Sequence, residues 1–82
     1  MSSNLSYLIH ELPQFQDEIR LLNLHNHGFK NMAIEYQQLI NRIQALDDTT
    51  EAHKRRQYQH RQDALKQSIQ SMLVKHALAA TL

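Results

Sequence analysis

The 82-residue chain contains no cysteine, no tryptophan, one glycine and one proline. Without cysteine it can form neither a disulfide nor a thiolate-ligated zinc site. A β-sheet protein of this length needs several turns, which draw on glycine and proline, so one residue of each predicts a few long helices instead. The hydrophobic share of 41% lies well above that of a disordered chain. We expect one small domain over residues 1–82.

Long apolar runs and targeting signals are also missing. Residues 1–13 contain no Lys or Arg and only short apolar runs, unlike a signal peptide. Nowhere do about 18 apolar residues follow one another, so no membrane-spanning helix is expected. The apolar residues also lack the Lys/Arg-rich polar face of a helix that lies on a membrane, so no membrane partner is expected. Together with the lack of cysteine, this favours a cytoplasmic protein.

The formal net charge is +1, but the charges are unevenly distributed. Residues 1–50 carry three basic and six acidic side chains, a net charge of −3, whereas residues 51–82 carry six basic and two acidic side chains, a net charge of +4. Opposite charges on two segments favour their packing side by side, and they indicate an external partner only weakly.

From residue 15 onward, apolar residues recur in alternating steps of four and three, the a/d spacing of a coiled coil. They are Phe15, Ile19, Leu22, Phe29, Ala33, Tyr36, Ile40 and Ile43, interrupted by Asn26. The spacing predicts one helix over about 13–46, with Pro13 in its first turn. Gly28 either weakens this helix or lets a neighbour approach closely.

A second seam predicts a second helix over about 51–80. Its members are Tyr58, Gln62, Leu65, Ile69, Met72, His76 and Ala79. Asp48 and Glu51 have the spacing of a capping box, which places a turn over 47–50. Because so short a connection makes the helices antiparallel neighbours, Ile40 is expected opposite Tyr58. The predicted fold is all-α: an antiparallel two-helix hairpin, coiled-coil-like, with a short helical segment over 1–12.

A lone hairpin leaves apolar residues outside its seam, mostly toward its open end. The segment over 1–12 either folds back over that end or joins a surface for self-association or for a partner. The candidate interaction surface consists of Leu8, Leu21, Leu24, Leu73 and Leu78. Because small scaffolds without disulfides usually need oligomerisation, a homodimer is expected.

The histidines show no metal-ligand pattern. His25 and His27 point different ways on a continuous helix, and His53 and His60 lie two turns apart. A glycine-rich loop and a nucleophile elbow are absent as well. We therefore expect no enzymatic activity, no metal and no cofactor. His76, at a seam position, is expected to be partly buried and satisfied, and to make association sensitive to pH.

The stretch His53–Arg61 is the sharpest functional candidate by charge. Its cations could contact phosphates, with Tyr58 available for base stacking. The candidate nucleic-acid contacts are Lys54, Arg55, Arg56 and Arg61. Against this hypothesis, Tyr58 also fits the hydrophobic seam. The sequence therefore predicts a non-enzymatic protein-interaction or regulatory adaptor, with a small nucleic-acid-binding regulator as the alternative.

The string His10-Glu11-Leu12-Pro13, followed by Phe15 and then by aromatics at heptad spacing, an acidic turn and a basic second helix, is distinctive. In these features residues 8–73 resemble the YdcH-like family of small bacterial proteins of unknown function. The segment Ala64–Ile69 departs from it, since the family carries an acidic pair there. The resemblance implies a helical hairpin in the bacterial cytoplasm and no catalytic residues.

Overall fold

The computed structural model describes residues 5–46 and 52–81. All elements in these ranges are helical: α1 (Ser6–Glu11), the 3-10 helix η1 (Pro13–Phe15), α2 (Gln16–His25), α3 (His27–Ala45) and α4 (Ala52–Thr81). The all-α prediction is thus confirmed for this part of the chain. The turn predicted over 47–50 and the capping pair Asp48 and Glu51 lie outside the described residues.

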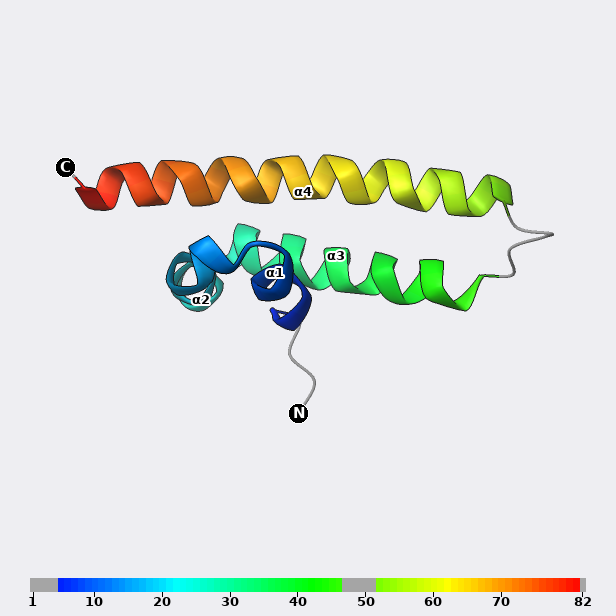
Figure 1. Ribbon diagram of the computed structural model, residues 1–82, viewed down its shortest axis with the longest axis horizontal. Helices are drawn as coiled ribbons and strands as arrows, with labels where there is room; N and C mark the ends of the chain where they lie inside the picture. The colour runs from blue at the N-terminus through cyan, green and yellow to red at the C-terminus, as the bar shows by residue number, and fades with distance from the viewer. Residues whose placement is uncertain (1–4, 47–51, 82) are drawn as a thin grey trace.

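Helices α3 and α4 run antiparallel along the long axis, and α1 and α2 lie crosswise on the α3 side (Figure 1). The Arg55 Nη2 donates to the Leu46 carbonyl at 3.4 Å, and the Arg42 guanidinium lies 6.0 Å from the ring centroid of Tyr58. Both pairs follow the register expected from folding the chain about residues 47–50. The antiparallel neighbours are therefore α3 and α4.

The structure corrects the single helix predicted over about 13–46. The chain forms η1, α2 and α3 there, so it contains four described α-helices and not the two of the predicted hairpin. The break falls at Asn26, whose backbone is extended (φ −131°, ψ 109°). The Phe29 N–H donates to Asn26 Oδ1 at 2.9 Å, which makes Asn26 the N-cap of α3.

The heptad pattern continues across this break and hides it in the sequence. Ile19 before the break and Phe29 after it are both fully buried. Because α2 and α3 both turn their apolar faces to one core, the spacing resembles that of one continuous helix. The spacing alone therefore does not distinguish an asparagine inside one continuous apolar seam from an asparagine that caps the start of a new helix.

Gly28 is the second residue of α3, next to the capping side chain. A Cβ atom at Gly28 would lie 3.2 Å from Asn26 Oδ1, closer than an ordinary van der Waals contact. The glycine therefore leaves room for the cap. Of the two roles expected for Gly28, the structure supports close approach, and the approaching neighbour is a side chain from the same segment.

The core is a single cluster of buried apolar residues drawn from all four α-helices and from the residue between α1 and η1. Its members are Leu8, Leu12, Ile19, Phe29, Ala33, Tyr36, Leu39, Ile40, Leu65, Ile69 and Leu73. The burial of Leu8 and Leu12 shows that residues 5–12 fold back onto their own chain. They do so over the middle of α3, while α2 lies nearer the C-terminal end of α4 (Figure 1).

One carboxylate, that of Glu11 at the end of α1, joins three helices. The Tyr36 hydroxyl on α3 donates to Glu11 Oε1 at 2.6 Å, and the Lys66 Nζ on α4 donates to Glu11 Oε2 at 3.1 Å. Burial raises the pKa of Tyr36 above its usual value of 10.0, and the hydrogen bond to Glu11 raises it further. Tyr36 therefore keeps its proton and remains a donor at neutral pH.

We predict that Tyr36→Phe lowers the free energy of unfolding by about 1–2 kcal/mol, because a half-buried carboxylate loses a buried donor. Urea denaturation followed by circular dichroism measures this. The matched control is Tyr7→Phe. The Tyr7 hydroxyl accepts a 3.3 Å hydrogen bond from Gln44 at an exposed position, so its loss should cost less than about 0.5 kcal/mol. Equal losses in the two variants would contradict a special role for Glu11.

A second prediction concerns the helix break. Asn26→Ala should lower the free energy of unfolding by about 1 kcal/mol, because it removes the cap of α3. The control Asn31→Ala, at an exposed position inside α3, should have no such cost. Gly28→Ala should be more favourable in the Asn26→Ala background than in the wild type, since the added Cβ then meets no capping oxygen. Additive effects in this double-mutant cycle, measured by urea denaturation, would argue against the contact.

Candidate functional site

The five leucines predicted to form an interaction surface separate into two groups. Leu8 and Leu73 are fully buried, so their assignment to the surface is wrong. Leu8 faces the core because α1 folds back onto the chain, and Leu73 follows the buried Ile69 by four residues on the inward face of α4. The other three are exposed: Leu21 by 46%, Leu24 by 75% and Leu78 by 61%.

Val74 is also exposed, by 45%, and belongs with these three leucines. Leu21 and Leu24 are three residues apart and share one face of α2, while Val74 and Leu78 are four apart and share one face of α4. Both pairs lie toward the same end of the molecule, where α2 lies beneath the C-terminal half of α4 (Figure 1). We call Leu21, Leu24, Val74 and Leu78 the terminal apolar residues.

The C-terminal end of α4 extends past α2 (Figure 1). Up to residue 79, where the description of burial ends, Leu73 is the last buried residue of α4, and every residue from 74 to 79 is exposed or half-buried. Lys75 is the one Lys, Arg, Asp or Glu within these six residues. A helix with apolar residues on several faces is normally covered in the assembled protein. Residues 74–79 of α4 are therefore a largely apolar stretch that the other described residues leave uncovered.

The basic stretch at the other end of α4 is largely engaged within the chain. Arg61 holds Glu35 through two hydrogen bonds, Nε to Oε2 at 2.7 Å and Nη2 to Oε1 at 3.0 Å. This hydrogen-bonded guanidinium lowers the pKa of Glu35 below its usual value. Arg55 is half-buried and donates to the Leu46 carbonyl. Two of the four predicted phosphate contacts thus bind groups on α3 or at its end.

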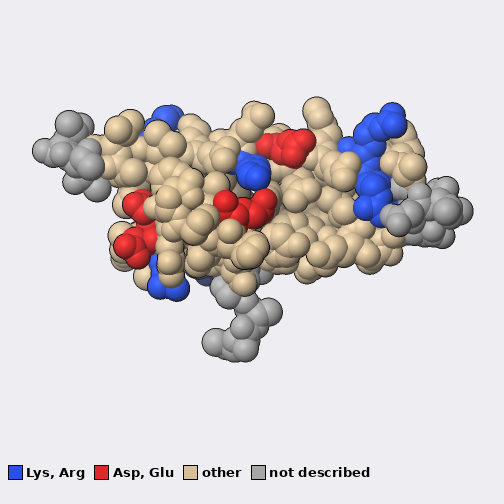
Figure 2. Space-filling model, viewed as in Figure 1, with Lys and Arg blue, Asp and Glu red and all other residues tan. Residues whose placement is uncertain are grey.

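The remaining members of the basic stretch lie near the start of α4. Lys54 and Arg56 are exposed, and Figure 2 shows Lys and Arg side chains gathered at this end of the molecule. Tyr58, the predicted stacking residue, is half-buried against the core and lies beneath the Arg42 guanidinium. Partial burial and the neighbouring guanidinium therefore reduce the ring surface that could stack on a base.

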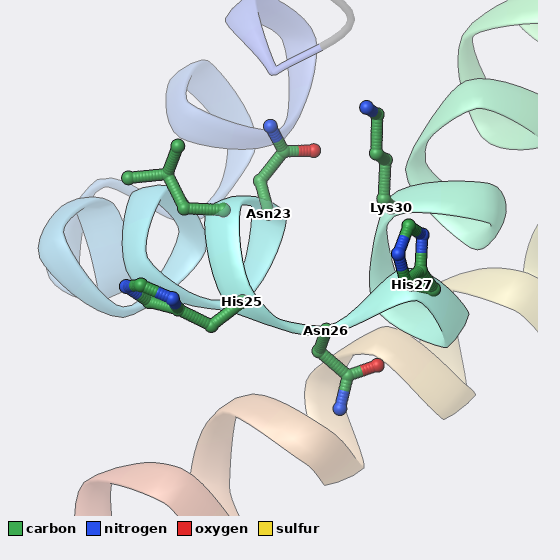
Figure 3. A pocket seen from close by; sticks show the side chains of 6 residues that line it. Asn23, His25, Asn26, His27 and Lys30 are labelled. Atoms are coloured by element: carbon green, nitrogen blue, oxygen red, sulfur yellow. The ribbon is translucent and has the colours of Figure 1, made fainter.

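A small hollow lies at the break between α2 and α3. It is lined by Asn23, Leu24, His25, Asn26, His27 and Lys30. Figure 3 shows Asn23 and Lys30 pointing to one side of the break and His25 pointing away from them. The heptad spacing predicts a continuous helix through this segment and therefore gives no sign of the hollow. The available signal was Asn26 itself, because asparagine is a preferred N-cap residue.

The histidines of this hollow do not form a metal centre. In residues 5–46 and 52–81, no group of three His, Asp or Glu side chains is arranged to hold a metal ion. His76, expected to be satisfied in the seam, is half-buried, but its Nδ1 is buried without a hydrogen-bond partner. That expectation is therefore right about burial and wrong about hydrogen bonding.

Comparison with protein-family models, with curated proteins and with solved structures finds no match to this chain. The resemblance to the YdcH-like family thus stays a prediction. Within the described residues, no helix is both long and apolar enough to cross a bilayer.

The Arg61–Glu35 pair should make stability depend on acidity. Because the pKa of Glu35 is lowered in the folded chain, the pair stabilises the fold above the usual value of 4.5, and this contribution disappears as the pH falls through the lowered pKa. The stability difference between wild type and Arg61→Gln should therefore shrink on going from about pH 6 to about pH 3. Urea denaturation across this range measures it.

The matched control is Arg56→Gln, which removes the same charge from an exposed position on the same helix. Its stability difference from the wild type should change less over this pH range. Identical pH profiles for the two variants would show that overall charge, and not the pair with Glu35, is responsible.

Proposed function

We propose that this chain is a non-enzymatic protein-interaction module, a small regulatory adaptor that binds another polypeptide through its terminal apolar residues. The observation that carries the proposal is the exposure of Leu24 by 75% and of Leu78 by 61% in a chain that otherwise builds a closed core. Large apolar side chains grouped at one end of a small protein favour a contact with another apolar surface.

The spacing of the exposed residues indicates the kind of contact. Pairs three or four residues apart form a stripe along one helix face, which is how an amphipathic helix fits a groove or a neighbouring helix. The terminal apolar residues supply two such stripes, one on α2 and one on α4. We therefore propose helix-on-helix packing as the mode of binding, with a homodimer as its simplest form.

The pair α3 and α4 would serve as a coiled-coil-like scaffold for this surface. Buried residues on α3 follow the steps of four and three expected for such a seam: Phe29, Ala33, Tyr36 and Ile40. On α4, Leu65 and Ile69 are buried four residues apart, and Met72 packs against the core three residues later. The resemblance to the YdcH-like family, which implies a helical hairpin in the bacterial cytoplasm, is compatible with this proposal.

The alternative, a nucleic-acid-binding regulator, has less support. Arg61 is held by Glu35, Arg55 donates to a backbone carbonyl, and Tyr58 is half-buried. Two of the four predicted cations are thus held within the chain, which weakens a phosphate-contact role for this stretch.

The experiment compares the wild type with Leu24→Glu and Leu78→Glu, each immobilised to capture binding partners from a cell lysate. The same proteins are also examined for self-association by light scattering. A buried charge without a partner opposes burial of either position, so both variants should lose at least about tenfold in affinity for whatever the wild type binds. The exposed positions predict that circular dichroism of both variants stays native.

The control variant is Gln67→Glu, which adds the same charge at an exposed, polar position of α4. It should bind like the wild type. If neither leucine variant changes any association, with itself or with a captured protein, the proposed function is wrong. Salt-dependent gel shifts that Lys54→Ala and Arg56→Ala abolish would favour the nucleic-acid alternative.

A further inference from the structure

We infer that a second copy of this chain covers the terminal apolar residues, with the end of α4 from each chain packed on the outer face of α2 of its partner. This inference rests on the proposed function and names the partner. Three observations support it: the two exposed stripes match each other in character, neighbouring charges are complementary, and the exposed area suits a stable dimer.

The first observation is self-complementarity. Leu21 and Leu24 form one apolar stripe on α2, and Val74 and Leu78 form another on α4. Leu21 and Leu24 lie on the side of α2 opposite the buried Ile19. All four residues stay exposed in the single chain, so the two stripes do not cover each other there. A two-fold symmetric dimer would cover both stripes, because the end of α4 in each chain would pack on α2 of the other chain.

The second observation concerns the charges beside the stripes. Asp17 precedes Leu21 by four residues and is exposed on the outer side of α2. Lys75 lies directly after Val74 and is exposed on α4. When the α4 end of one chain lies on α2 of its partner, these residues supply opposite charges at the rim of each contact. Such rim pairs contribute little affinity but favour the correct pairing of surfaces.

The third observation is the amount of apolar surface. With exposures of 46%, 75%, 45% and 61%, the four terminal apolar residues present on the order of 400 Å² per chain, within the range of a functional patch. A standard interface buries roughly 800 Å² per partner, a little over half of it apolar. The projecting end of α4 makes this area accessible, because it extends beyond α2 of its own chain (Figure 1).

The lack of cysteine in the chain allows a direct test by disulfide crosslinking. Leu24→Cys and Leu78→Cys are prepared as separate proteins, one with an affinity tag, then mixed at about 100 μM and oxidised. The proposed contact brings residue 24 of one chain to residue 78 of the other. Mixed dimers should therefore clearly exceed half of the crosslinked product, the share that random pairing gives. Gln67→Cys mixed with Leu24→Cys is the control and should give little product.

Light scattering of the unmodified chain at the same concentration provides the second measurement. A dimer mass is expected, and Leu78→Glu should lower the association constant at least about tenfold, while Gln67→Glu should not. A monomer mass for the wild type would overturn the second copy as partner, but it would leave the proposed function standing if the leucine variants still lose a captured protein. Crosslinks that form equally well within each single variant would overturn the α4-to-α2 pairing.

Discussion

The hydrogen bond from the Phe29 N–H to Asn26 Oδ1 determines where α3 begins, and the rest of the arrangement depends on that position. A continuous helix from residue 13 to residue 46 would pair with α4 along a single seam and leave the N-terminal residues without a core. Ending α2 at His25 lets the chain turn, so that α2 and α1 lie crosswise on α3. Gly28 contributes to the same helix start, because a side chain there would crowd the Oδ1 atom of Asn26 that caps α3.

The break at Asn26 lets all four α-helices contribute to one core. That core also contains a polar group, and this group needs a hydrogen-bond partner. The ring of Tyr36 is buried in that core, so its hydroxyl is buried with it. A buried hydroxyl without a hydrogen-bond partner would lower the stability of the fold. Glu11 meets this requirement and is itself balanced by Lys66 on α4. Glu11, Tyr36 and Lys66 thus form one hydrogen-bonded network that connects α1, α3 and α4. This network helps to specify how the three helices pack together.

Closing the core in this way determines which apolar residues remain outside it. Leu8 and Leu73 are buried, whereas Leu24 and Leu78 point away from the core at the end where α4 extends past α2. The basic end of the molecule behaves differently, because Arg61 and Arg55 have partners on α3 or at its end. In the described residues, the exposed apolar end and the partly paired basic end support the proposal of protein contact over phosphate contact.

Sequence patterns were sufficient for the helical class, the antiparallel neighbours and most of the buried positions, because helix-forming composition and heptad spacing are local properties of the chain. Residues such as Phe29, Tyr36 and Ile69 could be assigned to the core from spacing alone. The break at Asn26, the burial of Leu8 and the link between Glu11 and Lys66 depend on contacts between segments up to 55 residues apart. Spacing along one helix carries no information about such contacts. Which leucines stay exposed was therefore decided by packing, because the exposure of a side chain depends on where all the other segments lie.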